Sequence, residues 1–360
     1  MDIQPVNIVH SLVVWLSLLY SIILITPKYN KKPSNKFLSL LLLSLGIHFG
    51  YNVLYTNGYF LDTLPFYSCL YGYLYGPLFF LHIKFHLRKD TLFKPIDWLH
   101  FFPFFLILII TFFGYSLCGL LGIYILPTML SYCFFSYKEI RRYKRIILQV
   151  SSKNHTAEIK WLETMLIIML VIVFINLIQT FRSTIFIGSS EISLEIIVQI
   201  GVLILVNTIV YQGIKNPQLF QQISKKDEDI VKVNIRENLN TEALKEFSIV
   251  LDSYFKKHKP YLNSDLNINT LSNNMNVSAK SISQTINNII GCNFTDYINS
   301  HRIDEAKNML KNSMQNGLSI KEIMYDVGFN SRSVFNTLFK KKTGLTPSQY
   351  KILHQKRSDS

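Results

Sequence analysis

The sequence predicts an all-α protein, a seven-helix transmembrane bundle followed by an all-helical domain. A length of 360 residues leaves room for at least two domains. A mean hydropathy of +0.22 coexists with a net charge of +14, so apolar bulk and excess charge must lie in different parts of the chain. Apolar runs of about twenty residues fill residues 7–212, whereas residues 241–360 place apolar residues three and four apart. We expect a transmembrane domain at 1–212, a connector at 213–240 and a helical domain at 241–360.

The composition excludes several classes of protein. A disordered chain cannot have a positive mean hydropathy, and a soluble enzyme seldom does. The four cysteines Cys69, Cys118, Cys133 and Cys292 form no CxxC pair, which argues against a disulfide scaffold, a zinc module or a redox site. The motifs GxxxxGK[ST], GxGxxG, HExxH and GxSxG are also missing. We therefore expect no enzymatic activity and no cofactor.

Seven apolar segments are each long enough to cross the hydrocarbon core as a helix. They cover Asn7–Thr26, Phe37–Thr56, Pro65–His86, Ile96–Tyr115, Leu117–Tyr137, Trp161–Arg182 and Leu194–Gln212. We expect the first segment to be retained as a span and not removed as a signal peptide, because Asp2 precedes it, a basic leading region is missing, and lysines follow without a small-residue cleavage site.

Basic residues alternate between the connections and predict the orientation. The connections after the first, third and fifth segments are rich in lysine and arginine: Lys28, Lys31, Lys32, Lys36, Lys84, Arg88, Lys89, Lys94, Lys138, Arg141, Arg142, Lys144, Arg145, Lys153 and Lys160. The opposite side holds Asp62, a tight turn at 114–116, and Arg182 as its one cation. We expect a multi-pass protein of the bacterial inner (cell) membrane, in contact with the lipid bilayer, with its amino terminus outside and its carboxyl terminus in the cytoplasm.

The spans contain two patterns with alternative interpretations. Gly72 and Gly76 form a GxxxG motif that allows close helix approach, either within the chain or in a homodimer. His82 and His86 lie one helical turn apart, and with His100 they are weak candidates for a metal site; the alternative is histidines at the membrane interface. Polar residues inside the spans either bond between helices or line a pocket for an unknown signal molecule.

The carboxyl-terminal third contains one pattern twice, a short helix, a tight turn and a second helix. In the first copy Asn276 occupies the turn and Ser278 is expected to cap the second helix, and the two apolar stripes are Ile268, Leu271, Met275 and Ile282, Ile286, Ile289. In the second copy Ser319 and Glu322 form a capping box, Gly328 turns the chain and Ser331 is expected to cap. Its stripes are Ile320, Ile323, Met324, Val327 and Val334, Phe335, Phe339. A helix over Thr295–Leu310 links the copies. The arrangement is that of a double helix-turn-helix, whose second helices can enter major grooves.

Residues 327–351 resemble the carboxyl-terminal signature of AraC-family transcription regulators. The resemblance rests on Val327-Gly328-Phe329-Asn330-Ser331, Phe335, Phe339-Lys340-Lys341 and Thr343 through Lys351. Pro260-Tyr261-Leu262, Gly291, Arg302-Ile303 and Ala306 extend it over residues 260–351. The sequence departs from the family pattern at two places. Ser272 stands where alanine is usual, and Gln284 through Asn287 stand where Arg-x-Phe-Lys is frequent. Several spans before such a domain resemble the membrane-embedded branch of the family.

The outward-facing residues near the start of each second helix are the expected base readers. These are Lys280, Ser281, Ser283 and Gln284 in the first copy and Arg332, Ser333, Asn336 and Thr337 in the second. Lys340, Lys341 and Lys342 are expected to hold phosphate. A basic balance in residues 241–360, sixteen Lys and Arg against ten Asp and Glu, suits double-stranded DNA as the partner.

Three functions are compatible with these observations. The first is a membrane-tethered, sequence-specific DNA-binding transcription regulator whose spans act as sensor or anchor. The second is a membrane enzyme or transporter with a regulatory helical tail. The third makes the helical tail a protein-docking module. The connector would reach about 30 Å if it behaved as a flexible chain.

Overall fold

The computed structural model describes residues 5–26, 32–59, 68–89, 91–113, 118–153, 155–185, 195–215, 222–233, 241–312 and 317–358. The described residues form helices and no β-strand, which confirms the all-α class. They divide into two compact units. The apolar unit comprises residues 1–143 and 158–222, and the carboxyl-terminal unit comprises 144–157 and 223–360.

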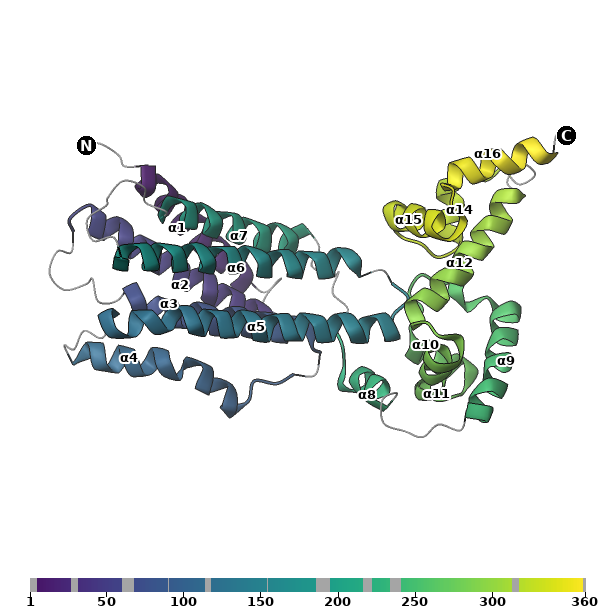
Figure 1. The fold of residues 1–360 in the computed structure, drawn as a ribbon, viewed down its shortest axis with the longest axis horizontal. Helices are drawn as coiled ribbons and strands as arrows, with labels where there is room; N and C mark the ends of the chain where they lie inside the picture. The colour runs from purple at the N-terminus through teal and green to yellow at the C-terminus, as the bar shows by residue number, and fades with distance from the viewer. Residues whose placement is uncertain are drawn as a thin grey trace. The chain divides into compact units, whose positions relative to one another are not determined.

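The apolar unit is a bundle of long helices (Figure 1). Its elements are α1 (Pro5–Ile25), α2 (Pro33–Thr56), α3 (Ser68–Leu87), η2 (Pro95–Phe101), α4 (Phe102–Phe112), α5 (Cys118–Val150), α6 (Thr156–Ile185) and α7 (Glu195–Lys215). Each of the seven apolar segments thus contains an α-helix, but in the fourth the α-helix α4 has eleven residues and follows the 3-10 helix η2. Within the described residues, four helices are long and apolar enough to cross a membrane: Asn7–Ile25, Pro33–Thr56, Pro95–Phe112 and Ile159–Gln179.

Small residues hold the helices of the apolar unit close together. The hydroxyls of Ser21 in α1 and Ser39 in α2 lie 2.9 Å apart in a buried contact. A Cβ atom at Gly72 would come within 2.8 Å of Ile125 in α5, and one at Gly76 within 2.6 Å of Tyr132. The GxxxG motif of α3 therefore packs against α5, which favours internal packing over a homodimer for this surface.

The candidate metal ligands are not gathered in one place. His82 and His86 are neighbours on α3, with ring centroids 5.3 Å apart. His100 instead contacts Tyr132, whose hydroxyl lies 3.0 Å from its Nδ1. No group of three or more His, Cys, Asp or Glu side chains that could hold a metal occurs in the described part of the chain.

Two of the basic residues used to predict orientation also tie helices together. Lys84 donates to Asp97 of η2 at 2.7 Å, and Arg88 donates to Glu139 of α5 at 2.6 Å. Lys28, Lys31, Asp62 and the turn at 114–116 lie outside the described residues.

The carboxyl-terminal unit is built from short helices around two small cores. They are α8 (Lys225–Val233), α9 (Thr241–His258), η3 (Pro260–Leu262), α10 (Ile268–Met275), α11 (Ala279–Gln284), η4 (Thr285–Ile290), α12 (Phe294–Lys311), α14 (Ile320–Asp326), α15 (Arg332–Thr343) and α16 (Pro347–Ser358). In the second core, side chains of α12, α14, α15 and α16 converge on Phe335 and Phe339, which are fully buried.

The unit boundary differs from the one expected at residue 212. Part of the predicted connector forms the helix α8 and belongs to the carboxyl-terminal unit, together with residues 144–157 at the end of α5 and the start of α6. Ile230 and Val231 of α8 are buried, which a free polar connector would not achieve. The flexible reach expected for residues 213–240 therefore does not apply to α8.

Candidate DNA-binding surface

The first helix-turn-helix consists of α10, the turn at 276–278 and α11. Asn276 has a positive φ of 54°, and Ser278 accepts a hydrogen bond from the backbone N–H of Ser281, so both predicted turn residues are confirmed. Ser272, which stands where the family usually has alanine, donates to the carbonyl of Val277 and closes the turn. Ile268, Leu271, Ile282 and Ile286 are fully buried. After Gln284 the helix widens into a π-helical segment, η4, which the sequence pattern did not predict.

The second helix-turn-helix consists of α14, the turn at 327–331 and α15. Ser319 and Glu322 form the predicted capping box, and Gly328 has a φ of +89°. A Cβ atom at Gly328 would also lie 2.8 Å from the carbonyl oxygen of Leu262, so glycine is required by both conformation and space. Ser331 occupies the N-cap position of α15 but makes no side-chain capping hydrogen bond, so that expectation was wrong.

The linking helix α12 contributes a buried cation at the centre of the unit. Arg302 is 2% exposed and donates to the carbonyl oxygens of Tyr261 and Asn263, each at 2.7 Å. It also donates to the carbonyl and hydroxyl oxygens of Ser152, each at 3.2 Å. Burial lowers the pKa of Arg302 to about 10, partly offset by Asp265, and the guanidinium stays charged at neutral pH. The sequence pointed to Arg302 only through the family resemblance.

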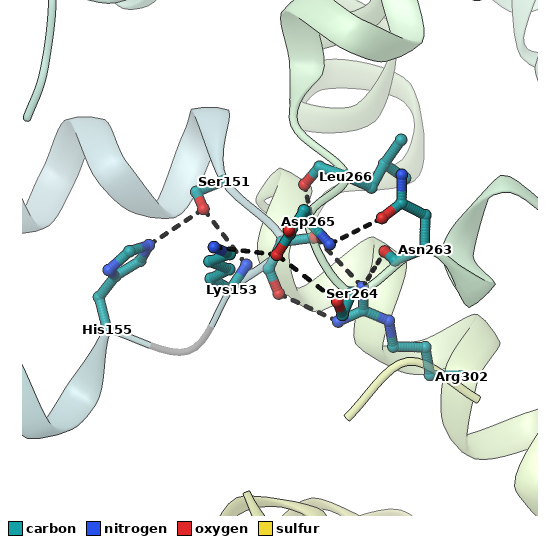
Figure 2. Close-up of polar contacts among 9 residues, drawn as sticks. Ser151, Lys153, His155, Asn263, Ser264, Asp265, Leu266 and Arg302 are labelled. Carbon is teal, nitrogen blue, oxygen red and sulfur yellow. Dashed lines mark hydrogen bonds and ion pairs between the residues drawn. The ribbon is translucent and has the colours of Figure 1, made fainter. Parts of the chain in front are cut away.

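Residues 148–153 form a second, unpredicted contact with the linking helix and the loop before α10. Ser152 donates its N–H and hydroxyl to the carbonyl of Leu266, and Thr295 donates to the carbonyls of Leu148 and Ser151. Lys153 pairs with Asp265 at 2.9 Å (Figure 2). The backbone of Ser151 forms an isolated antiparallel bridge with Asn267. Ser151 and Ser152 are each 1% exposed. Single serines in a basic loop give no pattern from which this contact could have been found.

The predicted base readers of the second helix-turn-helix lie on an open surface. Arg332, Ser333 and Thr337 are exposed and Asn336 is half-buried, all in the first half of α15. Lys340 and Lys341 are exposed further along the same helix. This helix therefore presents amide, hydroxyl and guanidinium groups followed by two cations.

The predicted readers of the first helix-turn-helix are arranged differently. Lys280 and Ser281 are partly exposed, whereas Ser283 and Gln284 are only 1% and 4% exposed. The expectation that Ser283 and Gln284 face solvent was wrong for this conformation. Two helices outside the motif, α9 and α8, pack against α11, and α8 lies in the segment that was expected to be a connector.

The third lysine of α15 is engaged within the protein. The ammonium group of Lys342 contacts the carbonyl and hydroxyl oxygens of Ser300, at 2.9 Å and 2.6 Å, and the carboxylate of Asp304. Burial alone would raise the pKa of Asp304, but the hydrogen bonds from Lys342 and Lys307 hold it below its usual value. Lys342 therefore fixes α15 on α12 and does not join the phosphate-binding group expected from the sequence.

Comparison with known proteins agrees with this geometry. A family described as "Helix-turn-helix domain" matches residues 271–352. An uncharacterized HTH-type transcriptional regulator in the cgkA 5′ region of Pseudoalteromonas carrageenovora is 34% identical over 88 residues, which are 24% of this chain and 50% of that protein. The chain thus spans about half the length of this curated relative. No solved structure is significantly similar to the chain.

The match begins inside α10 and ends inside α16, so it contains both turns, the linking helix and both second helices. The carboxyl-terminal part of the chain therefore contains a helix-turn-helix domain, and the match agrees with the resemblance to AraC-family regulators.

Proposed function

We propose that the protein is a membrane-tethered, sequence-specific DNA-binding transcription regulator. The observation that carries the proposal is the exposed face of α15 within a domain of the AraC-type helix-turn-helix class. In such domains the second helix of each motif enters the major groove with its amino end towards the bases.

The residues of α15 divide into two roles by position and chemistry. Arg332 suits a guanine edge and Asn336 an adenine edge, with Ser333 and Thr337 beside them; a bidentate contact contributes about 1–3 kcal/mol of discrimination. Lys340 and Lys341, further from the amino end, suit phosphate contacts that hold the helix in register. Lys280 and Ser281 are the partly exposed counterparts on α11.

The amino-terminal part supports a membrane location. Four described helices have the length and composition of membrane spans, and the remaining apolar helices α3, α5 and α7 bring the proposed number to seven. The alternation of basic connections supports an orientation with the amino terminus outside and the carboxyl-terminal unit in the cytoplasm, where DNA is. In this role the spans act as an anchor or as the sensor of a signal molecule.

The orientation can be tested by labelling from outside the cell. A cysteine introduced by Gly58→Cys should react with a membrane-impermeant maleimide in intact cells, because it follows α2 on the outer side. A cysteine introduced by Lys89→Cys should react only after the cells are lysed. The opposite pattern would contradict the proposed orientation.

The DNA-binding role can be tested with the full-length protein in lipid nanodiscs. Duplexes are selected from a random pool by the wild-type protein, and their affinity is then measured for variants. Arg332→Ala and Asn336→Ala should each weaken binding by about 1–3 kcal/mol and relax specificity at one base pair. Lys321→Ala, which removes an exposed charge from α14, is the charge-matched control for Arg332→Ala and should have little effect. A wild-type protein that selects no sequence would overturn the proposed function.

A further inference from the structure

The outer face of α11 is buried, although nothing in the helix-turn-helix itself requires it. An α-helix turns about 100° per residue, so Gln284 lies nearly opposite the core residues Ala279 and Ile282. Lys280, one turn before Gln284, shares this outer side. Yet Gln284 is 4% exposed, and Ser283, beside it, is 1% exposed. A helix buried on both sides must have a neighbouring element on each.

Outside its own motif, α11 packs against α8 and, to a lesser extent, against α9, and we infer that α8 is the neighbour on the outer side. Among the described elements, α11 is the one against which α8 packs extensively. Ile230 and Val231 of α8 are each 6% exposed, as expected for the apolar side of a docked helix. Asp227, near the start of α8, accepts a hydrogen bond of 3.1 Å from Asn269 of α10, so α8 is also attached to the first helix of the same motif.

The start of α8 is encoded locally. The backbone N–H of Ser224 donates to the carboxylate of Asp227 at 2.9 Å, and the N–H of Asp227 donates to the Ser224 hydroxyl at 3.2 Å. This reciprocal pair is the hydrogen-bonding pattern of a capping box. The helix and its attachment to α10 are therefore specified by the same carboxylate.

The covered face is better suited to DNA than to α8. The side-chain nitrogen of Gln284 is buried and has no hydrogen-bond partner among the described residues. A buried unpaired amide is unfavourable, and it would be relieved by a base edge or by water. The acidic residues 227–229 of α8 are balanced by Lys225, Lys226 and Lys232, so α8 excludes DNA by occupying this face and not by its net charge.

We propose that α8 is an autoinhibitory cover of the first recognition helix. While α8 is docked, α15 is the open reading helix and Ser283 and Gln284 are withheld from DNA. Undocking of α8 exposes them with Lys280 and lets the domain occupy a second major groove. Because α8 begins at Lys225, soon after α7 ends at Lys215, a change in α7 reaches the cover through a short stretch of chain. The proposal rests on the proposed DNA-binding function.

The cover can be opened by Ile230→Glu, which places a charge on its buried side. Lys226→Gln changes the net charge by the same amount at an exposed position of α8 and is the matched control. A duplex is first selected with the wild-type protein and is then extended on both sides by random flanking sequence. In nanodiscs, the Ile230→Glu variant should bind this extended duplex at least tenfold more tightly than the wild-type protein does. It should also protect an additional major groove in a hydroxyl-radical footprint. Lys226→Gln should match the wild type; affinity and footprint of Ile230→Glu equal to those of the wild type would overturn the proposal.

A measurement without DNA separates the cover from the DNA-binding function. Gln284→Cys is introduced into a full-length chain whose four native cysteines are alanine, and its reaction with a soluble maleimide is timed. Adding Ile230→Glu should accelerate the reaction at least tenfold, whereas a reporter Ser333→Cys on exposed α15 should react equally in both backgrounds. Equal rates at position 284 would overturn the cover. Faster labelling with no sequence-selective binding by any variant would instead overturn the proposed function, and with it the inhibitory role.

Discussion

At the scale of single residues, two turn positions determine the helix-turn-helix geometry. Asn276 and Gly328 both have positive φ, which reverses the chain between the paired helices. Asparagine tolerates this conformation because its side chain is short and polar, so Asn276 suffices in the first turn. At Gly328 the carbonyl oxygens of Tyr261 and Leu262 leave no room for any side chain. The two turns therefore have different tolerance to substitution.

Gly328→Ala should destabilise the second helix-turn-helix more than a simple conformational penalty predicts. Gly344→Ala is the matched control, because Gly344 has a similar φ of +78° but nothing within 4 Å of its would-be Cβ. We expect about 1–3 kcal/mol of local destabilisation for Gly344→Ala from backbone strain, and more for Gly328→Ala. Amide hydrogen exchange of α14 and α15 in the full-length protein measures the difference. Equal losses in the two variants would show that the carbonyl contacts at Gly328 have no energetic effect.

At the scale of elements, the sequence predicted what local chemistry encodes. The capping serines Ser278 and Ser319, the turn residues and the apolar stripes placed α10, α11, α14 and α15, because each signal acts within a few residues. The π-helical segment and the docking of α8 were not predictable in this way. The sequence of α8 is mostly charged, and its two buried residues, Ile230 and Val231, are too few to indicate which surface they cover. That choice depends on tertiary packing.

The lysines of α15 show how packing divides residues that look alike in sequence. Lys340 is exposed and available to phosphate, whereas Lys342 is bound to Ser300 and Asp304 of α12. We expect Lys340→Met to weaken binding to all duplexes and to reduce the slope of log affinity against log salt by about 1. Lys342→Met should leave that slope unchanged, because its ammonium group is engaged by Ser300 and Asp304. Binding titrations at several salt concentrations measure both, and a lower slope for Lys342→Met would contradict this division of roles.

At the scale of the whole molecule, the carboxyl-terminal unit is connected to the apolar unit by more than one chain segment. The chain passes between the two units three times, at 143–144, 157–158 and 222–223. The positive mean hydropathy and the +14 charge correctly indicated two parts, but a boundary drawn from hydropathy assigns residues 144–157 to the membrane domain. Those residues bond to Arg302, Leu266 and Thr295, all in the carboxyl-terminal unit. Hydropathy cannot detect this, because it averages along the chain and not across space.

The three crossings predict the result of cutting the chain between α7 and α8. Cleavage at a protease site inserted within residues 216–221 would break the covalent link between residues 223–360 and the proposed spans. The carboxyl-terminal fragment should nevertheless stay with the membrane fraction, because Arg302, Thr295 and Leu266 hold the uncut segment 148–153 by buried hydrogen bonds. The bonds donated by the charged Arg302 contribute about 1.5–3 kcal/mol each, and the neutral bonds of Thr295 and Leu266 about 0.5–1.5 kcal/mol each.

Combining the cut with Arg302→Met and Thr295→Val should release the fragment into the soluble fraction, because both substitutions remove donors to residues 148–152. Thr343→Val, a threonine substitution on α15 outside this contact, is the control and should leave the fragment attached. Sedimentation of membranes after cleavage measures the distribution. If the fragment without further substitutions is released quantitatively, the polar contact around Arg302 does not hold the carboxyl-terminal unit. The covalent link between α7 and α8 would then be what retains it.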